Sequence, residues 1–257
     1  RLSYAYGFRT PTLQELYFSF HNDNHDIDGN PDLKAEYSNN VTGSFTYRIL
    51  HNARIRLTTT LSGFYNVFKD KISLAQNVDI PNYNTYYNIG RYKTLGGALE
   101  TSLAWGGLRV NVNASLIGRY NQYASDDKSL PQFRYSPEVS TNISYHIAKS
   151  GTDISFFYKY TGQRKEYYYH EYTTPDNQKE SEIYLRGLPS YHYGDITVTQ
   201  KLTSFLSLNV GVKNLFNLTD IRTISESAND TPSVSYLGCG RSYFIGLNLM
   251  LNGKFKK

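Results

Sequence analysis

The chain lacks the features that mark helical membrane proteins and disulfide-linked proteins. A single cysteine, Cys239, occurs in 257 residues, so no internal disulfide can form and the redox compartment is left open. No segment comes close to the roughly 20 consecutive apolar residues of a transmembrane helix. The mean hydropathy is −0.53. A membrane β-barrel remains compatible with these values, because its strands expose apolar residues on one face only.

The signals of nucleic-acid binders and of common enzymes are also missing. The formal net charge is only +5 and the basic residues are scattered, so nucleic acid is not an expected partner. There is no nucleophile–base pair, no phosphate-binding glycine loop and no zinc-type Cys/His spacing, which argues against an enzyme. Tyrosine is abundant instead, with 25 residues against one tryptophan. Tyrosine suits both β-strands and the aromatic girdles of membrane barrels.

Apolar and polar residues alternate along the whole chain, which is the pattern of half-buried strands. The alternation is strictest at 108–116, where every second residue from Leu108 to Leu116 is apolar. Helical periodicity is not convincing in any segment. The pattern predicts ten strands, near 2–8, 38–50, 55–69, 94–106, 108–116, 138–148, 152–164, 191–202, 206–216 and 241–251.

Short and long connections alternate between these ten strands. The long ones lie near 9–37, 70–93, 121–137, 165–190 and 217–240, and the short ones near 50–54, 106–107, 149–151 and 203–205. Transmembrane barrels have this asymmetry, with tight turns at one end and long extracellular loops at the other. We therefore expect an all-β protein, a transmembrane antiparallel β-barrel. Its polar face would line the lumen through Arg56, Glu100, Arg109, Asn111, Asn113, Asn142, Lys159, Lys201 and Lys213.

Two short motifs flank the first long connection. Phe8-Arg9-Thr10-Pro11 and Asn30-Pro31-Asp32-Leu33 resemble the paired boxes of TonB-dependent outer-membrane receptors. Further matching stretches occur in the same order as in that family: Glu15-Leu16-Tyr17, Lys34-Ala35-Glu36, Lys213-Asn214-Leu215-Phe216-Asn217 and Gly240-Arg241-Ser242-Tyr243. The usual terminal aromatic of the closing strand is replaced by Leu251 and a short basic tail.

The resemblance implies a 22-stranded barrel with an N-terminal plug, of which residues 1–257 supply the last ten strands. Neither plug-like sequence nor a TonB box occurs here, and the start at Arg1 suggests a cleaved leader or an internal fragment. The implied location is the outer membrane of a Gram-negative bacterium, which the chain crosses many times. The implied partners are the plug and remaining strands of the same receptor, the TonB complex acting through that plug, outer-membrane lipids, and a small iron complex or corrinoid. A surface lipoprotein is left open as a further partner.

The order of elements is closest to the branch that contains haem and cobalamin receptors. Haem receptors of that branch carry a ligating histidine between the two boxes, and here the loop offers His21 and His25. Neutral imidazole is a good iron ligand, although polar loops often hold histidines without a function. We expect no intrinsic cofactor, with haem as the transported ligand. A cobalamin or siderophore receptor, without an axial histidine, is the alternative.

The same loop admits a second interpretation. Its run Asn24-x-Asp26-x-Asp28-Gly29 imitates the start of a calcium loop, whose oxygen ligands alternate before a glycine. The twelfth position should be glutamate but is Ala35, so a helix-loop-helix site is not expected. Loose cation binding by Asp23, Asp26 and Asp28 and a merely solvated acidic loop both stay open.

Aromatic residues in two other loops are candidates for ligand contact. These are Tyr86 and Tyr87, beside Tyr83, and Tyr169 and His170, in the run that begins at Tyr167. The alternative role of these tyrosines is the outer aromatic girdle, which we favour for Tyr167.

Two functions of other classes remain as contrasts to a receptor. The first is a ten-stranded outer-membrane protease, in which Asp126, Asp127 and His170 would activate a water, although no motif joins them. The second is a ten-stranded adhesin. Transport of a scarce iron complex, with haem first, is the leading hypothesis.

Overall fold

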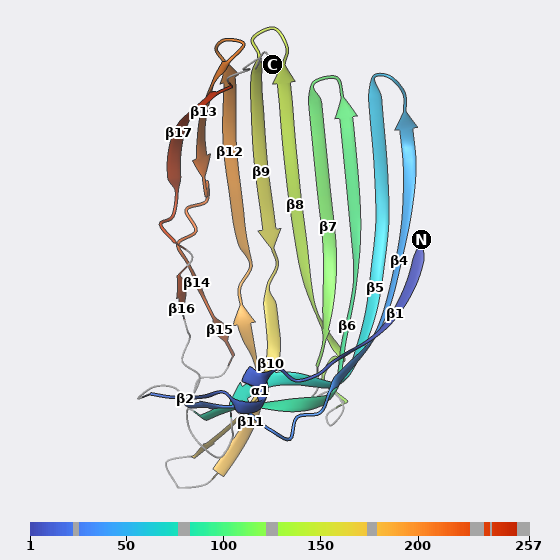
Figure 1. Ribbon diagram of the computed structural model, residues 1–257, viewed down its shortest axis with the longest axis vertical. Coiled ribbons are helices and arrows are strands. Elements are labelled where there is room, and N and C mark those ends of the chain that lie inside the picture. The colour runs from blue at the N-terminus through green and yellow to red at the C-terminus, as the bar shows by residue number, and fades with distance from the viewer. Residues whose placement is uncertain are drawn as a thin grey trace, which may run out of the picture.

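Ten strands lie side by side in one antiparallel row in the computed structural model, in the order β1-β4-β5-β6-β7-β8-β9-β12-β13-β17 (Figure 1). The structure describes residues 1–22, 26–76, 83–121, 128–173, 179–226, 234–236 and 238–250. The ten predicted strands correspond to the ten strands of this row, and further short strands lie outside it. The strands are β1 Leu2–Arg9, β4 Glu36–His51, β5 Ile55–Gln76, β6 Tyr83–Trp105, β7 Leu108–Tyr120, β8 Phe133–Ile147, β9 Thr152–Thr161, β12 Tyr191–Lys201, β13 Leu206–Lys213 and β17 Ser242–Leu249.

The two ends of this sheet differ in the length of their connections. Tight turns join β4 to β5, β6 to β7, β8 to β9 and β12 to β13 at the upper end of Figure 1, and the long connections gather at the lower end. Gly106 (φ 55°) and Gly151 (φ 66°) provide the left-handed conformations that two of these turns need. The predicted alternation of short and long links is therefore confirmed. We call the lower end the rim.

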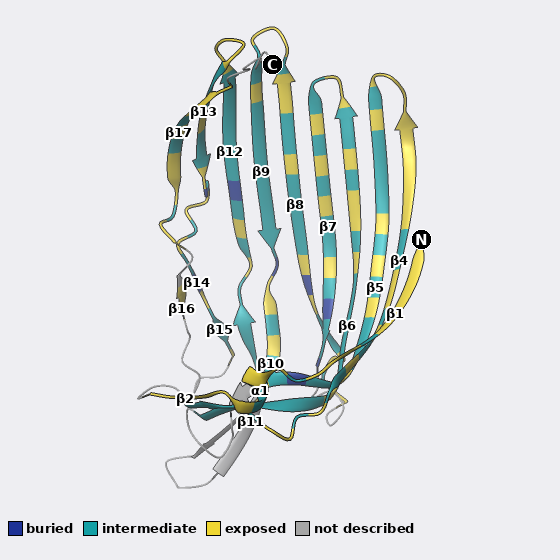
Figure 2. Cartoon of the chain, in the orientation of Figure 1, coloured by how far each residue is buried: buried dark blue, intermediate teal, exposed yellow. Residues whose placement is uncertain are grey.

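The register sorts side chains onto two chemically different faces. Arg56 lies in a cross-strand row with Ala104 and Arg109, and Glu100 in a row with Asn113, so the polar residues of these strands share one face. The remaining predicted lumen residues fall on the same face, namely Asn111, Asn142, Lys159, Lys201 and Lys213. Exposed and half-buried positions alternate accordingly along the first half of β7, from Leu108 to Asn113 (Figure 2).

The opposite face is apolar and open. Phe45, Leu61 and Leu99 form one of its rows and are 66%, 58% and 46% exposed. Among the described residues only Ile72 and Ile221 are buried hydrophobic side chains. A water-soluble sheet would have to cover such a face, whereas a membrane strand presents it to lipid.

Three predicted loops contain regular structure that the sequence pattern did not show. The 70–93 segment is mostly strand, because β5 and β6 extend to Gln76 and Tyr83. The 165–190 segment forms a hairpin of β10 (Arg164–Thr173) and β11 (Lys179–Leu188), and β11 also pairs with β15 (Ile224–Ser225). A two-stranded ribbon joins β14 (Asp220–Arg222) to β16 (Val234–Tyr236). These segments are long connections as predicted, but the sequence pattern did not identify the strands within them.

The first long connection also holds a short helix, contrary to the expectation of none. Helix α1 spans Leu13–Tyr17 and is followed by a small hairpin of β2 (Ser19–His21) and β3 (Asp26–Asp28). Strand β3 pairs in parallel with the start of β6. None of the helices in the described residues has the length and apolar character needed to cross a membrane.

The stretch at 213–217 ends β13 in a turn fixed by asparagines. Asn214 has a positive φ of 56°, its backbone N–H donates to Oδ1 of Asp195 at 2.8 Å, and its side chain bonds both backbone groups of Leu218 at 2.8 and 2.9 Å. Asn217 Oδ1 accepts from the backbone N–H of Arg241 at 2.9 Å. The two C-terminal matching stretches are therefore joined to each other and to β12.

Candidate functional site

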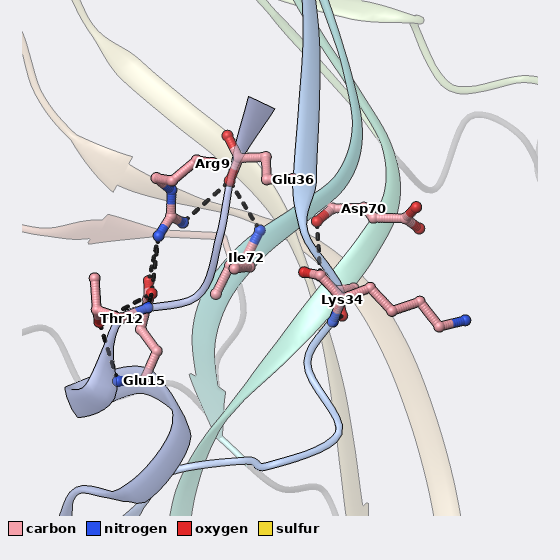
Figure 3. A network of polar contacts seen from close by, with 8 residues as sticks. Arg9, Thr12, Glu15, Lys34, Glu36, Asp70 and Ile72 are labelled. Carbon is pink, nitrogen blue, oxygen red and sulfur yellow. Dashed lines mark hydrogen bonds and ion pairs between the residues drawn. The ribbon is translucent and has the colours of Figure 1, made fainter. Parts of the chain in front are cut away.

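The first motif is fastened to the sheet by Arg9, the last residue of β1. Its Nη1 donates to both carboxylate oxygens of Glu15 at 2.8 and 3.0 Å, and Nη2 donates to Oε2 of Glu36 at 3.2 Å. The two acids are only 16% and 15% exposed, and Figure 3 shows the guanidinium between them. A planar guanidinium can serve two carboxylates at once. The end of β1, helix α1 and the start of β4 therefore meet at one side chain.

Glu15 also caps the helix in which it lies. Its backbone N–H donates to the Thr12 hydroxyl at 3.2 Å, and its carboxylate accepts from the Thr12 backbone N–H at 2.7 Å, which completes a capping box. Burial alone would raise the pKa of Glu15, but hydrogen bonds from Arg9 and Thr12 outweigh it and hold the pKa below its ordinary value. The ionised carboxylate thus links the helix cap to the end of β1.

The second motif returns the chain to the same place. The Asn30 backbone N–H donates to the Glu15 carbonyl at 2.8 Å, and its side-chain amide donates to the Tyr86 carbonyl at 2.8 Å. A Cβ on Gly29 would lie 2.5 Å from the backbone of Leu16. Close backbone packing therefore requires glycine at this position, which is a reason independent of any cation.

Asn88 of β6 then ties the segment after the second motif to β5. Its side-chain amide donates to the carbonyls of Lys34 and Asp70 at 3.0 and 2.7 Å, and its Oδ1 accepts from the Lys34 N–H at 2.8 Å. Two residues further on, Glu36 Oε2 accepts from the backbone N–H of Ile72 at 3.1 Å (Figure 3). We call these contacts of Arg9, Glu15, Glu36 and Asn88 the rim network.

The rim network surrounds a bend in β5 at Asp70. Asp70 has a positive φ of 55°, which is uncommon for a residue other than glycine. Phe68 and Lys71 both contact Tyr92. The ring centroids of Phe68 and Tyr92 are 6.1 Å apart, and the Lys71 ammonium lies 4.0 Å from the centroid of the Tyr92 ring. Residues three apart cannot share a face of a regular strand. The bend therefore reverses the alternation and turns Lys71 onto the polar face.

A pocket of about 330 Å³ lies on that face, where β5 to β8 and β10 approach one another. We call it the rim pocket, and its wall includes Lys71, Tyr92, Arg119, Arg134, Glu166 and Tyr167. Arg134 lies 5.7 Å from the centroid of the Tyr167 ring. Arg119 Nε is 3.9 Å from a carboxylate oxygen of Glu166. Three cations, one carboxylate and several phenol rings therefore converge at the rim.

His21, one of the two predicted haem-ligating residues, is held by three neighbours. Its Nδ1 lies 3.1 Å from Asp26 Oδ1, and its Nε2 lies 2.8 Å from the Ser19 hydroxyl and 3.3 Å from Asp28 Oδ1. Hydrogen bonds, first from Ser19 and also from Tyr83 and His21, lower the pKa of Asp28. Iron at Nε2 would have to replace Ser19 and Asp28, while Asp26 would keep the ring oriented through Nδ1.

The other predicted site residues are placed only in part. His25, Asp23, Asn24, Asp126 and Asp127 lie outside the described residues. Tyr86 and Tyr87 lie on β6 opposite Leu74 and Ser73, and the parallel pairing of β3 with Tyr83–Thr85 brings the His21 hairpin next to them. Tyr169 and His170 lie on β10 with backbones opposite Ile183 and Glu182, but their side chains are outside the described part.

The remaining motif residues differ in exposure. Phe8 is 70% exposed on the apolar face, Pro31 is exposed, and Pro11 and Leu33 are half-buried. Among the described residues, no group of three His, Cys, Asp or Glu side chains is arranged to hold a metal ion.

The rim pocket was missed in the sequence because its residues come from segments interpreted as loops or strand ends. Lys71 and Tyr92 fall within 70–93, Arg134 falls within 121–137, and Arg119 lies just before that segment. The available signal was a basic residue next to tyrosine at Arg119-Tyr120 and Arg134-Tyr135. The sequence alone does not show that the neighbouring strands bring these pairs together.

Comparison with known proteins identifies relatives over most of the chain. The family model described as "TonB dependent receptor-like, beta-barrel" matches residues 1–215. Hemoglobin-haptoglobin-binding protein A of Haemophilus influenzae is 30% identical over 234 residues, which cover 84% of this chain and 22% of that protein. The iron-regulated outer membrane virulence protein of Vibrio cholerae is 25% identical over 267 residues, which cover 95% of this chain and 36% of that protein.

Solved structures show the same arrangement of strands. The FrpB iron transporter of Neisseria meningitidis (F3-3 variant) has a TM-score of 0.57 at 19% identity, over 96% of this chain and 36% of that one. A ferric enterobactin receptor mutant (R480A) from Pseudomonas aeruginosa, in complex with enterobactin, has a TM-score of 0.63 at 18% identity, over 96% of this chain and 38% of that one. The chain thus spans between about a fifth and two fifths of the length of these proteins.

Proposed function

Because the chain belongs to the TonB-dependent receptor β-barrel family, we propose that it is the C-terminal barrel portion of a receptor that imports haem. Members of this family are β-barrels of Gram-negative outer membranes, and the relatives are receptors and transporters rather than enzymes. The family expected from the two motifs is confirmed. Family membership also removes the support for a ten-stranded protease or adhesin.

The observation that carries haem as the cargo is the likeness to a haemoglobin-haptoglobin-binding protein at 30% identity over 84% of this chain. The solved neighbours include a receptor in complex with enterobactin, but at 18% identity that likeness concerns the fold alone. A siderophore or cobalamin receptor is therefore the second candidate. It would hold its ligand through rim tyrosines without an axial histidine.

In the proposed mechanism the rim faces the outside of the cell and captures haem. His21, on the β2–β3 hairpin, would exchange Ser19 and Asp28 for the haem iron. The parallel pairing of β3 with β6, and the hydrogen bond from the Asn30 amide to the Tyr86 carbonyl, hold that hairpin against β6 and would give the imidazole a fixed approach. The polar face of the sheet would line the lumen around a plug supplied by the rest of the receptor. TonB would then act on that plug to open the path.

A haemin titration of the intact receptor that contains this chain tests the proposal. The Soret band should shift saturably, and either His21→Ala or His25→Ala should weaken the affinity. His51→Ala is the matched control, because His51 ends β4 at the tight-turn end, away from the rim. If the receptor shows no Soret shift but binds cobalamin or a ferric siderophore, haem is not the cargo and that ligand takes its place in the proposal.

A further inference from the structure

We propose that the rim pocket binds the carboxylates at the edge of the porphyrin, through Lys71, Arg119 and Arg134. The inference rests on the proposed function and deepens it by naming which part of the cargo this wall recognises. A histidine would hold the iron at the centre of the ring, whereas this pocket would hold the two acidic side arms. The three cationic residues lie outside both motifs, and the inference gives them a role in binding the ligand.

The charge of the pocket favours an anion. Three cationic side chains line it against one carboxylate, Glu166, whose contact with Arg119 at 3.9 Å is long for an ion pair. Arg119 is only 22% exposed, so its charge is partly removed from water. Hydrogen bonds between a cation and a carboxylate are about twice as strong as neutral ones, and partial burial reduces their screening by salt. An acidic ligand group would complete this set of charges.

The tyrosine rings orient two of the cations. Lys71 lies over Tyr92 at 4.0 Å, and Arg134 lies over Tyr167 at 5.7 Å. A ring face attracts the positive charge electrostatically and restricts the side chain, while N–H groups that point away from the ring can still donate to oxygen. The cations are thus partly ordered before the ligand arrives, which lowers the entropic cost of binding.

The bend at Asp70 shows that the position of Lys71 is specified by the fold. Lys69, two residues earlier, is exposed and shares the face of Tyr65 and Leu61, whereas Lys71 points into the pocket. Bulges and bends of this kind are common beside functional sites, where they re-aim a side chain. Here the bend is held by Asn88 and Glu36 of the rim network. The family motifs thus contribute to the pocket without lining it.

The size of the pocket fits part of a porphyrin. Its volume of about 330 Å³ lies at the lower end of the roughly 300–1,000 Å³ of small-molecule sites. The edge of the ring that carries the carboxylates is therefore the part expected to enter, with the rest of the porphyrin outside this wall.

The test compares haemin with haemin dimethyl ester, in which both carboxylates are masked and the iron and ring are kept. In the intact receptor, Lys71→Met and Arg134→Gln should each weaken haemin binding by about 10- to 100-fold, the range for losing a charge-assisted hydrogen bond. The same variants should bind the dimethyl ester as the unmodified receptor does. Lys69→Met is the matched control and should leave both affinities unchanged, and Lys71→Arg should retain most of the haemin affinity.

The outcomes separate this inference from the proposed function. If the receptor binds haemin but the Lys71 and Arg134 variants bind it normally, or lose both probes equally, the pocket assignment is overturned and haem transport stands. If the unmodified receptor binds neither probe, the proposed function is wrong and the pocket assignment is overturned with it. If the Lys71 and Arg134 variants lose affinity only for a ferric tris-catecholate complex, the inference is also overturned, because the pocket would then bind a siderophore.

Discussion

The wall of the sheet and its rim are held together by different kinds of interaction. The wall consists of ten antiparallel strands whose order in space is their order along the chain, with tight turns at one end and long connections at the other. The rim is fixed by polar contacts over long sequence distances, such as Arg9 with Glu36 and Lys34 with Asn88, which are 27 and 54 residues apart. The wall is thus a repeated local pattern, and the rim is one particular network.

This difference predicts that the stability cost of a charged substitution in the wall should depend on which face of the sheet carries it. Leu61→Arg should cost about 2–4 kcal/mol near the middle of the membrane, because Leu61 lies on the apolar face with Phe45 and Leu99. Thr60→Arg, one residue away on the polar face, should cost much less. The measurement is denaturant unfolding of the intact receptor in lipid vesicles. Equal losses for the two variants would contradict the assignment of faces.

In the rim, the loss of a single polar side chain should instead lower the local stability. Arg9→Met removes the cation that serves Glu15 and Glu36 and leaves two largely shielded carboxylates without it. We expect a local destabilisation of about 1.5–3 kcal/mol, the range for hydrogen bonds to charged groups.

Hydrogen exchange of residues 9–37 in the intact receptor measures this effect. Exchange should rise there and stay unchanged in β7 and β8. Arg9→Lys is the conservative control and should recover only part of the protection, because an ammonium cannot reproduce the forked contacts of a guanidinium. A uniform rise in exchange across the sheet would mean that wall and rim are a single cooperative unit.

The same contrast explains what could be predicted from the sequence. The ten wall strands follow from period-2 alternation, because each strand has one apolar and one polar face. The boundaries of β5 and β6 were missed because the alternation reverses at Asp70, so the pattern stops matching although the strand continues. The helix α1 carried a usable signal, Thr12-x-x-Glu15, but it is too short for helical periodicity.

The rim pocket could not be predicted in the same way. Its cations lie on different strands, and only the register and the bend at Asp70 bring Lys71 to Tyr92. The motif residues were identified through a resemblance, and the structure adds the contacts of Arg9 and Asn30 that join them. Which histidine binds a ligand stays a prediction, and His25 lies outside the described residues.

A steric change at the rim gives a smaller expected effect. Gly29→Ala places a methyl group 2.5 Å from the backbone of Leu16, so helix α1 must move away from the second motif. Strain of this kind costs about 1–3 kcal/mol. Gly90→Ala is the matched control, because its added Cβ meets no atom within 4 Å. Proteolysis within 13–30 should accelerate for the first variant only, and equal rates for both would show that the close packing is unimportant.

The smallest expected effect is a response of the rim to acid. The pKa of Glu15 is held below its ordinary value, because the bonds from Arg9 and Thr12 outweigh burial. A lowered pKa in the folded state contributes stability that is present above the unfolded value of about 4.3 and is lost as the pH falls through the folded value. Protection of α1 from hydrogen exchange, corrected for the intrinsic rate, should therefore decrease as the pH falls below that unfolded value. Glu15→Gln should have weaker protection throughout and should lose this dependence, whereas Glu100→Gln on the wall should retain it. If the pH midpoint for the loss of α1 protection is the same in the unmodified receptor and in both variants, another group controls the acid response of the rim.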